Sequence, residues 1–218
     1  MNLKSIIPEF IKDYRHKQRI DKLQKASYLN WRKENYYKWE KEGKPIPPPH
    51  SVKQKVIHDY ITKYGCEIFV ETGTLHGDMI EAQKLFFNQL YSIELDEKLF
   101  KDAVNRFRYD RKIQIINGDS GKVMYELIKK INKRAIFWLD GHYSGTYTAL
   151  GDLECPIYEE LKAIFTSKIK NHIIIIDDAR CFTGNNSYPS VLELKDFVLK
   201  YNSNYKMIID SDSIRFEY

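Results

Sequence analysis

The sequence predicts an α/β fold: a mostly parallel, seven-stranded sheet flanked by helices, with a helical arm in front of it. Three observations predict this. From residue 67 onward, short apolar runs alternate with stretches of helical periodicity, which is typical of parallel strands joined by right-handed crossovers. Five of these runs end in an acidic residue. The last two runs are separated only by Asp-Ser-Asp, which predicts a hairpin and therefore one antiparallel strand at the carboxyl end of the chain.

Residues 1–49 are expected to form a basic, aromatic helical arm and a connector. Apolar residues recur at helical spacing through 1–42, and prolines at 45 and 47–49 favour a stiff, extended link. Residues 1–64 hold 15 Lys and Arg against 7 Asp and Glu, a net charge of +8. Basic residues interleaved with Trp and Tyr can stack on single-stranded nucleic acid, although such rings more often pack on the domain and leave the charges in water.

Residues 50–218 are expected to form the α/β domain, whose elements follow in a regular order. A helix over 51–64, with Ser51 as its cap, leads into it. Strands are expected at 67–70, 90–93, 113–116, 135–139, 172–176, 205–209 and 213–218. Helices are expected at 78–87, 97–107, 122–131, 156–165 and 190–201.

The composition favours a soluble, cytoplasmic protein. The chain has 218 residues, of which 43% are hydrophobic and 30% charged, so it can build a sizeable core. No apolar run approaches the roughly 20 residues that span a bilayer. The three cysteines show no Cys-x-x-Cys spacing, which indicates a reducing compartment rather than a disulfide framework or a thiolate zinc site.

The acids at the strand ends predict a ligand site, because the carboxyl ends of parallel strands meet at one edge of the sheet. Crowded negative charge at that edge calls for a cation or hydrogen-bond donors. The acids are Glu71, Glu94, Asp119, Asp140 and the pair Asp177 and Asp178. After the first of them, glycines at Gly73 and Gly77 allow the backbone to approach a ligand closely.

Glu94 and Asp119 are candidates for holding a nucleoside. Glu94 lies 23 residues after Glu71 at the end of the second strand, where a carboxylate can accept both hydroxyls of a ribose. Asp119 lies at the next strand end and is placed to meet a base, while Ser120 is a candidate cap for the following helix. The turn has neither the strict Gly-x-Gly-x-x-Gly spacing nor Gly-Lys-Ser/Thr, which excludes a P-loop nucleotidase.

This constellation resembles the class I S-adenosylmethionine-dependent methyltransferases over roughly residues 65–218. The stretch Glu-Thr-Gly-Thr-Leu-His-Gly at 71–77 looks like the first motif of the family, with Thr72 and Thr74 as departures from its common form. The resemblance implies a Rossmann-like methyltransferase fold with a reversed last strand. It implies S-adenosylmethionine as the cofactor, bound by Glu71, Thr72, Gly73, Thr74, His76, Gly77, Glu94, Asp119, Ser120 and Asp140.

Asp140, Asp177 and Asp178 predict a divalent-metal site, because three carboxylates at one sheet edge suit Mg²⁺. The pattern is similar to the metal-dependent O-methyltransferases of the macrocin and novobiocin sugar-tailoring type. That resemblance implies a metal that binds two substrate hydroxyls and makes one a better nucleophile. The alternative is that one of the paired aspartates caps a loop and no metal binds.

Several residues near Asp140 are candidates for catalysis or substrate binding. His142 is close enough in sequence to take a substrate proton, together with Asp140, although a histidine departs from the acidic residue of the sugar-tailoring enzymes. Tyr143 lies in the hydroxyl-rich loop Gly141–Gly151, which suits a sugar, and Arg180 can clamp an anionic substrate or pair with an acid. His76 is expected to shape the cofactor pocket.

The expected reaction is O-methylation of a sugar or glycoconjugate precursor, so the expected partner is a small-molecule or glycan acceptor. One rival function is a nucleic-acid methyltransferase that uses the basic arm, but no Asn/Asp-Pro-Pro-Tyr/Phe motif follows the fourth strand. A second rival is a non-catalytic module in which the arm and its prolines recruit partners. Neither rival explains the strand-end acids. The arm is also a candidate for homo-oligomer formation.

Overall fold

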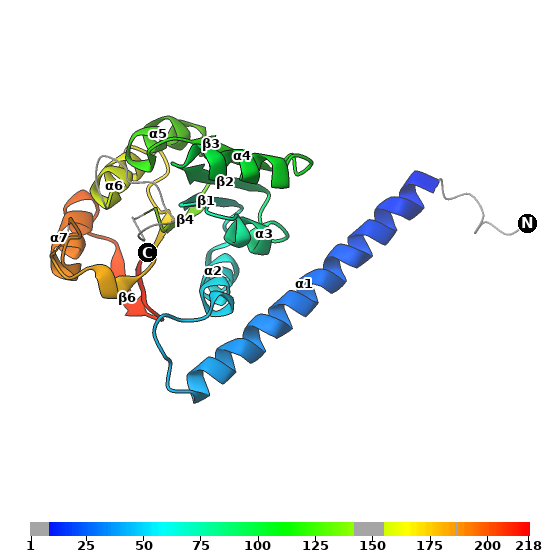
Figure 1. The fold of residues 1–218 in the computed structure, drawn as a ribbon, viewed down its shortest axis with the longest axis horizontal. Coiled ribbons are helices and arrows are strands. Elements are labelled where there is room, and N and C mark those ends of the chain that lie inside the picture. Colours follow the sequence, from blue (N-terminus) through cyan, green and yellow to red (C-terminus); the bar gives the residue numbers. More distant parts are fainter. Residues whose placement is uncertain (1–8, 142–154, 186) are drawn as a thin grey trace, which may run out of the picture.

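The computed structural model describes residues 9–141, 155–185 and 187–218, with the side chains of the first helix from residue 19 onward. A seven-stranded sheet has the order β3-β2-β1-β4-β5-β7-β6 (Figure 1). The strands are β1 (Ile68–Thr72), β2 (Gln89–Glu94), β3 (Ile113–Asn117), β4 (Ala135–Leu139), β5 (Ile173–Ile176), β6 (Lys206–Asp210) and β7 (Ser213–Glu217).

Helices precede the sheet and connect its strands. The described helices are α1 (Glu9–Lys41), α2 (His50–Tyr64), α3 (Asp78–Gln83), α4 (Glu97–Arg106), α5 (Ser120–Leu127), α6 (Ile157–Phe165) and α7 (Val191–Tyr201), with 3-10 turns η2 (Ile128–Lys130) and η3 (Ala179–Cys181). The five strands β1 to β5 are parallel, and β7 runs antiparallel to both β5 and β6. The predicted fold class, with its reversed last strand, is therefore confirmed.

The sheet is covered on both faces, as its apolar strands require. In β5, Ile174 and Ile176 join the core beneath α5, α6 and α7, while Ile173 and Ile175 join a second core beneath α2 and α3. All four isoleucines are buried. This is why the run reads as continuously apolar rather than as an alternation with one wet face.

The β6–β7 hairpin closes through Ser211 and Asp212, which have φ angles of 52° and 55°. Positive φ at both central residues matches the twist of the flanking strands and is tolerated by Asp better than by most residues. The Asp-Ser-Asp signal therefore marked a two-residue hairpin. The turn also brings Asp212 back toward the end of β5, where its carbonyl accepts a hydrogen bond from the Ala179 amide at 2.8 Å.

Some predicted boundaries were wrong. The helix expected over 78–87 ends at Gln83, and the first strand continues to Thr72 because that residue pairs with both β2 and β4. Helix α2 begins at His50 after Pro49, which makes no side-chain cap, so Ser51 is not the cap. Its side chain is instead buried in the first turn.

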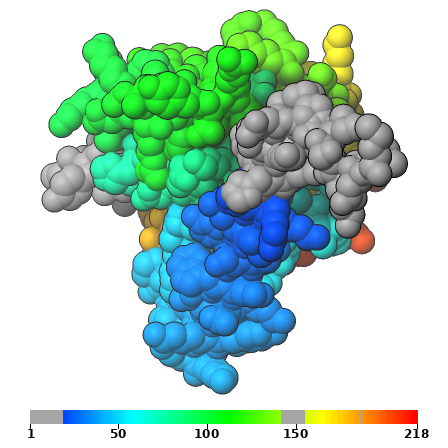
Figure 2. All heavy atoms as spheres, turned by 90° about the vertical axis from the view of Figure 1, so that its right-hand side faces the viewer, coloured from blue at the N-terminus to red at the C-terminus, as the bar shows by residue number. Residues whose placement is uncertain are grey.

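The arm is a single long helix that packs on α2 near its carboxyl end and extends beyond the body at its amino end (Figure 1). Figure 2 shows the arm, in blue, lying below the green elements. Trp39 is buried and donates its indole N–H to the Pro45 carbonyl at 2.8 Å, but Trp31 and Tyr37 are about half exposed, at 47% and 50%. Thus only part of the aromatic set packs on the domain. No described helix is long and apolar enough to cross a membrane.

Arg32 anchors the arm to the domain. Its side chain is 1% exposed, and it donates to the Gln54 side chain at 3.0 Å and to the Ala82 carbonyl at 2.5 Å. The guanidinium also lies 4.7 Å from the centre of the Phe86 ring. Burial lowers the pKa of Arg32 to about 10, so the group stays charged at neutral pH. This one side chain therefore joins α1 to α2 and to the end of α3.

Replacing Arg32 should loosen the arm and destabilise the whole domain. We expect Arg32→Ala to lower the free energy of unfolding by about 3 kcal/mol, because it leaves buried acceptors without donors. Lys33→Ala, at the exposed neighbouring position, should change it by less than about 0.5 kcal/mol. Urea unfolding followed by circular dichroism measures both. Equal effects of the two substitutions would contradict the anchoring role.

Candidate active site

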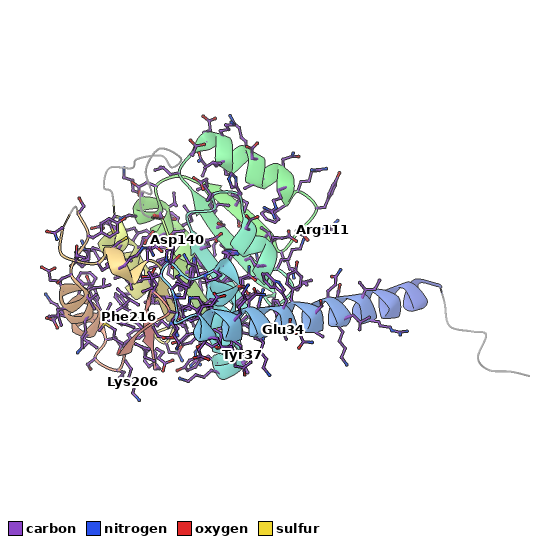
Figure 3. The ribbon with its side chains drawn as sticks, turned by 60° about the horizontal axis from the view of Figure 1, so that its bottom comes forward. Glu34, Tyr37, Arg111, Asp140, Lys206 and Phe216 are labelled. Atoms are coloured by element: carbon purple, nitrogen blue, oxygen red, sulfur yellow. The ribbon has the colours of Figure 1, made fainter. Side chains whose placement is uncertain are left out.

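The turn after β1 lies directly against the end of β4. The amides of Asp140 and Gly141 both donate to the Thr72 hydroxyl, at 3.2 and 3.1 Å. Gly73 has a φ of +81°, and a Cβ at this position would lie 2.5 Å from the Asp140 carbonyl oxygen. Only glycine fits both requirements. In consequence the glycine turn and Asp140 form one continuous edge, and Figure 3 shows Asp140 in the middle of the body, away from Lys206 of the edge strand β6.

Glu71 is held inside the protein by a chain of hydroxyl groups. It is 2% exposed, and the Ser92 hydroxyl donates to its carboxylate at 2.6 Å. The Thr74 hydroxyl lies 2.6 Å from that of Ser92, so Thr74 must be the donor to Ser92 when Ser92 donates to Glu71. Burial raises the pKa of Glu71 well above its ordinary value, although the bond from Ser92 opposes the shift. Glu71 thus stabilises the turn through the hydrogen bonds that link it to Ser92 and Thr74.

Ser92 was missed in the sequence, where a polar residue inside the apolar run 90–93 was the only signal. It is fully buried in β2, and its hydroxyl is the link between Glu71 and Thr74. A lone serine in a strand is usually a tolerated small residue. Its partner here lies on the neighbouring strand, 21 positions earlier, which local pattern does not reveal.

Glu94 stands at the end of β2, as predicted, and faces the same turn. One carboxylate oxygen accepts from the Leu75 amide at 2.8 Å and the other from the Asp96 amide at 2.9 Å. Each oxygen of a carboxylate can accept more than one hydrogen bond. The remaining lone pairs are suited to a pair of vicinal hydroxyls, so the structure is compatible with the predicted contact to a ribose.

Asp119 is the cap of α5, a role that the sequence assigned to Ser120. The Asp119 carboxylate accepts from the Gly121 amide at 2.9 Å, whereas Ser120 is the first residue of the helix and is buried. Aspartate is a preferred cap because its carboxylate satisfies a free helical N–H group. Capping uses one carboxylate oxygen. Contact between Asp119 and a base remains a prediction.

His76 is exposed in the turn, and the Arg106 guanidinium donates to its carbonyl at 2.5 Å. Gly77 follows with a φ of +79°, where a Cβ would lie 2.7 Å from the Phe107 ring. The turn is therefore closed on its outer side by the end of α4. His142 and Tyr143 lie outside the described residues, so their predicted roles stay predictions, as does that of the loop to Gly151 beyond Gly141.

The aspartates at the end of β5 bind a lysine. Asp177 is fully buried, and one of its oxygens accepts a hydrogen bond from the Lys53 ammonium group of α2. The same nitrogen lies 3.5 Å from the Asp178 carboxylate. Burial alone would lower the pKa of Lys53, but pairing with Asp177 outweighs it, so the pKa lies above its ordinary value. An internal cation therefore neutralises this edge of the sheet.

Arg180 pairs with acids, one of the two roles predicted for it. Its guanidinium donates to Asp178 at 2.8 Å and also to Asp212 in the hairpin turn. Asp178 itself has a φ of +54°, which bends the chain sharply after β5. Asp178 therefore lies between two positive groups. The second predicted role of Arg180, a clamp for an anionic substrate, has no support from these contacts.

The described residues do not fit the predicted magnesium site. Among residues 9–141, 155–185 and 187–218, no three His, Cys, Asp or Glu side chains are grouped to hold a metal ion. The Lys53 ammonium group lies between Asp177 and Asp178, two of the carboxylates that were expected to bind the metal ion. Mg²⁺ requires oxygen ligands about 2.0–2.1 Å away in a near-octahedral shell, and an ammonium at that place opposes it. The described arrangement therefore gives no support to metal binding by Asp140, Asp177 and Asp178, which stays a prediction.

A cavity of about 470 Å³ lies beside α6 and α7. Its lining combines aromatic rings with hydroxyl, carboxylate and ammonium groups. The lining residues are Cys155, Tyr158, Glu159, Lys162, Ser187 and Phe197. Cys155 also lines a smaller cavity that reaches Gly141 next to Asp140. The smaller cavity, which Leu139 and Gly141 line, is therefore the one that reaches the end of β4.

Comparison with known proteins supports the fold. No family model matches the sequence, and no curated protein is similar to it in sequence. Among solved structures, an O-methyltransferase from Bacillus cereus in complex with SAH superposes with a TM-score of 0.54 at 12% identity, covering 88% of this chain and 91% of that one. The SAH-bound Podospora anserina methyltransferase PaMTH1 has a TM-score of 0.51 at 10% identity and covers 99% of both chains. The chain thus has a methyltransferase-like fold.

Gly73→Ala should lower the free energy of unfolding more than the same substitution at another glycine whose backbone is in the left-handed region. Gly65 has a φ of +63°, and a Cβ there would have no atom within 4 Å, whereas a Cβ at Gly73 would meet the Asp140 carbonyl. We expect Gly73→Ala to destabilise the protein by about 2 kcal/mol more than Gly65→Ala. Thermal and urea unfolding measure the difference. Equal losses would show that β4 and the turn are not in close contact.

Glu71→Gln should flatten the dependence of stability on pH. A buried carboxyl with a raised pKa binds its proton more tightly in the folded state, so its contribution to stability falls as pH rises above the unfolded pKa, near 4.5. Glutamine keeps an acceptor for Ser92 but does not titrate. We expect the free energy of unfolding of the variant to fall less than that of the wild type between about pH 5 and pH 8. Parallel curves would contradict the shift.

Proposed function

We propose that this chain is an S-adenosylmethionine-dependent methyltransferase that methylates an oxygen of a hydroxyl-rich acceptor, such as a sugar or glycoconjugate precursor. One observation carries the proposal. The glycine turn after β1, the acid at the end of β2 and Asp140 at the end of β4 share one edge of the sheet, and Gly73 touches the Asp140 backbone. Ligands of open α/β sheets bind at this edge.

The cofactor fits the donors and acceptors of this edge. Glu94 has carboxylate lone pairs left for two ribose hydroxyls after it binds the Leu75 and Asp96 amides. Asp119 lies at the end of the adjacent strand, where the base would follow. Thr72, Gly73 and Thr74 form the turn after β1, on the other side of Glu94 from Asp119. When bound, the cofactor supplies a methyl group on a positively charged sulfur.

The reaction asks little covalent chemistry of the protein. A bond forms between the acceptor oxygen and the methyl carbon, the carbon–sulfur bond breaks, and the acceptor proton passes to a base. Rate enhancement then depends on holding the oxygen in line with the methyl group. Asp140 stands where the cofactor turn meets the acceptor side, and it stays, with His142, the predicted site of proton uptake.

The acceptor class rests on the chemistry of the neighbouring cavity. Hydroxyl, carboxylate and ammonium groups beside the rings of Tyr158 and Phe197 suit a ligand that carries several hydroxyls on an apolar frame. Among the cations of the basic arm, Arg32 is used to attach the arm to the domain, and no contact of the described residues favours the nucleic-acid alternative. Magnesium assistance is left out of the proposal, since Lys53 occupies the position between Asp177 and Asp178.

Isothermal calorimetry with S-adenosylhomocysteine tests the cofactor. We expect one equivalent to bind the wild type and the affinity of Glu94→Gln to fall at least about tenfold, because a carboxylate accepts hydroxyl donors better than an amide does. Glu97→Gln is the matched control, since the Glu97 side chain is 73% exposed and pairs only with Lys101 among the described residues. No binding to the wild type, or equal loss in both variants, would overturn the proposal.

A further inference from the structure

Lys53 reaches the candidate site from an element far away in the sequence. It lies in the first turn of α2, between the buried Val52 and the buried Gln54 that holds Arg32. Its ammonium group donates a hydrogen bond to Asp177, which follows β5 and lies 124 positions later in the sequence. The side chain is only 18% exposed, against 1% for Asp177 and 17% for Asp178. A lysine is seldom buried to this extent unless its charge is paired.

The carboxylates around Lys53 favour a positive group at this place. One carboxylate oxygen of Asp177 accepts a hydrogen bond from Lys53. The other is buried with no hydrogen-bond partner among the described residues. Asp178 lies between Lys53 and Arg180. Asp140, at the neighbouring strand end, is close enough to help raise the pKa of Lys53. Carboxylates from two strand ends therefore act on one cation.

We propose that Lys53 is the resident cation of the acceptor side, in the position that a divalent ion would otherwise take between Asp177 and Asp178. The inference rests on the proposed function. An ammonium group has three N–H donors. Asp177 and Asp178 take two of them in the described part of the chain, and the third is left to bind and position an acceptor oxygen. Acceptor binding at this edge then needs no metal ion.

The placement also explains why the arm is attached so firmly. Lys53 and Gln54 are consecutive residues of α2, so the helix that delivers the cation is the one that Arg32 fixes to α1 and to the end of α3. A small rotation of α2 would withdraw the ammonium from Asp177. The arm therefore supports the position of the cation from outside the site.

Electron paramagnetic resonance of Mn²⁺ tests the assignment directly, because bound Mn²⁺ loses the sharp signal of the free ion. The wild type is expected to leave the signal unchanged at about 1 mM protein, since Mn²⁺ and the ammonium compete for the same carboxylates. Lys53→Met removes the charge, retains much of the length, and should bind about one Mn²⁺. Adding Asp177→Asn to that variant should weaken binding at least about tenfold, because a ligand is lost.

Lys55→Met is the matched control. Lys55 lies two residues further along α2 and pairs outward with Asp59 at 2.7 Å, so its loss should leave Mn²⁺ unbound, as in the wild type. Mn²⁺ binding by the wild type that Asp177→Asn abolishes would overturn the proposal. Failure of both wild type and Lys53→Met to bind Mn²⁺ would overturn it as well, because the position would then not be one for a cation.

Two further measurements keep the result decisive. Circular dichroism and S-adenosylhomocysteine binding are recorded on the same samples, so a protein that fails to bind cofactor is told apart from one whose cation site is misassigned. If Lys53→Met does not fold, the double variant Lys53→Met with Asp177→Asn removes the unpaired buried carboxylate, and recovery of folding supports the pairing. Absence of that recovery, together with Mn²⁺ binding by the wild type, counts against it.

Discussion

The close contact between Gly73 and the end of β4 is the constraint on which the site depends. Without a Cβ at Gly73, the turn lies against the Asp140 carbonyl, and Thr72 fastens it there by accepting two amide hydrogen bonds. This contact brings the cofactor side of the sheet edge to the acceptor side. Beneath the turn, Glu71 is fixed by Ser92 and Thr74, and above it Glu94 accepts from the Leu75 amide. The turn is thus held from three directions before any ligand binds, which reduces the ordering cost of binding.

The second organising feature is the balance of charge at the end of β5. Three buried or half-buried aspartates, Asp177, Asp178 and Asp212, are neutralised by Lys53 and Arg180, which come from α2 and from η3. Truncating one partner of such a pair leaves an uncompensated charge and costs about 3–5 kcal/mol when the site is dry. The lysine arrives on a helix that Arg32 ties to the arm. Charge compensation therefore couples the arm, the second helix and the sheet edge into one unit.

Much of the fold could be predicted from local pattern. The four isoleucines of β5 and the run 135–139 read directly as strands because both of their faces are buried, and Asp-Ser-Asp marked the hairpin that reverses β7. The acids Glu94 and Asp140 were found because a strand end is visible in sequence.

The partners that these side chains contact were not visible in the sequence. Ser92 acts on a residue of the adjacent strand, and Lys53 acts on residues 124 and 125 positions away. The carboxylates were recognised, but the cation that binds them was predicted to be a metal ion. No local pattern in the sequence indicates that a distant lysine contacts these carboxylates. Asp119 rather than Ser120 caps α5. The sequence did not reveal this, because two adjacent residues of cap-forming type cannot be ranked without backbone geometry.

A crystal structure of the protein soaked with S-adenosylhomocysteine and Mn²⁺ tests the central claim most directly. The account predicts the cofactor product along the turn from Glu71 to Gly77, with its ribose hydroxyls on Glu94 and its sulfur facing Asp140. It also predicts the Lys53 ammonium between Asp177 and Asp178, with no anomalous manganese signal there. A ligand bound elsewhere, or a turn that stays empty at saturating concentration, would contradict the assignment of the site. Manganese between the two aspartates would contradict the role of Lys53.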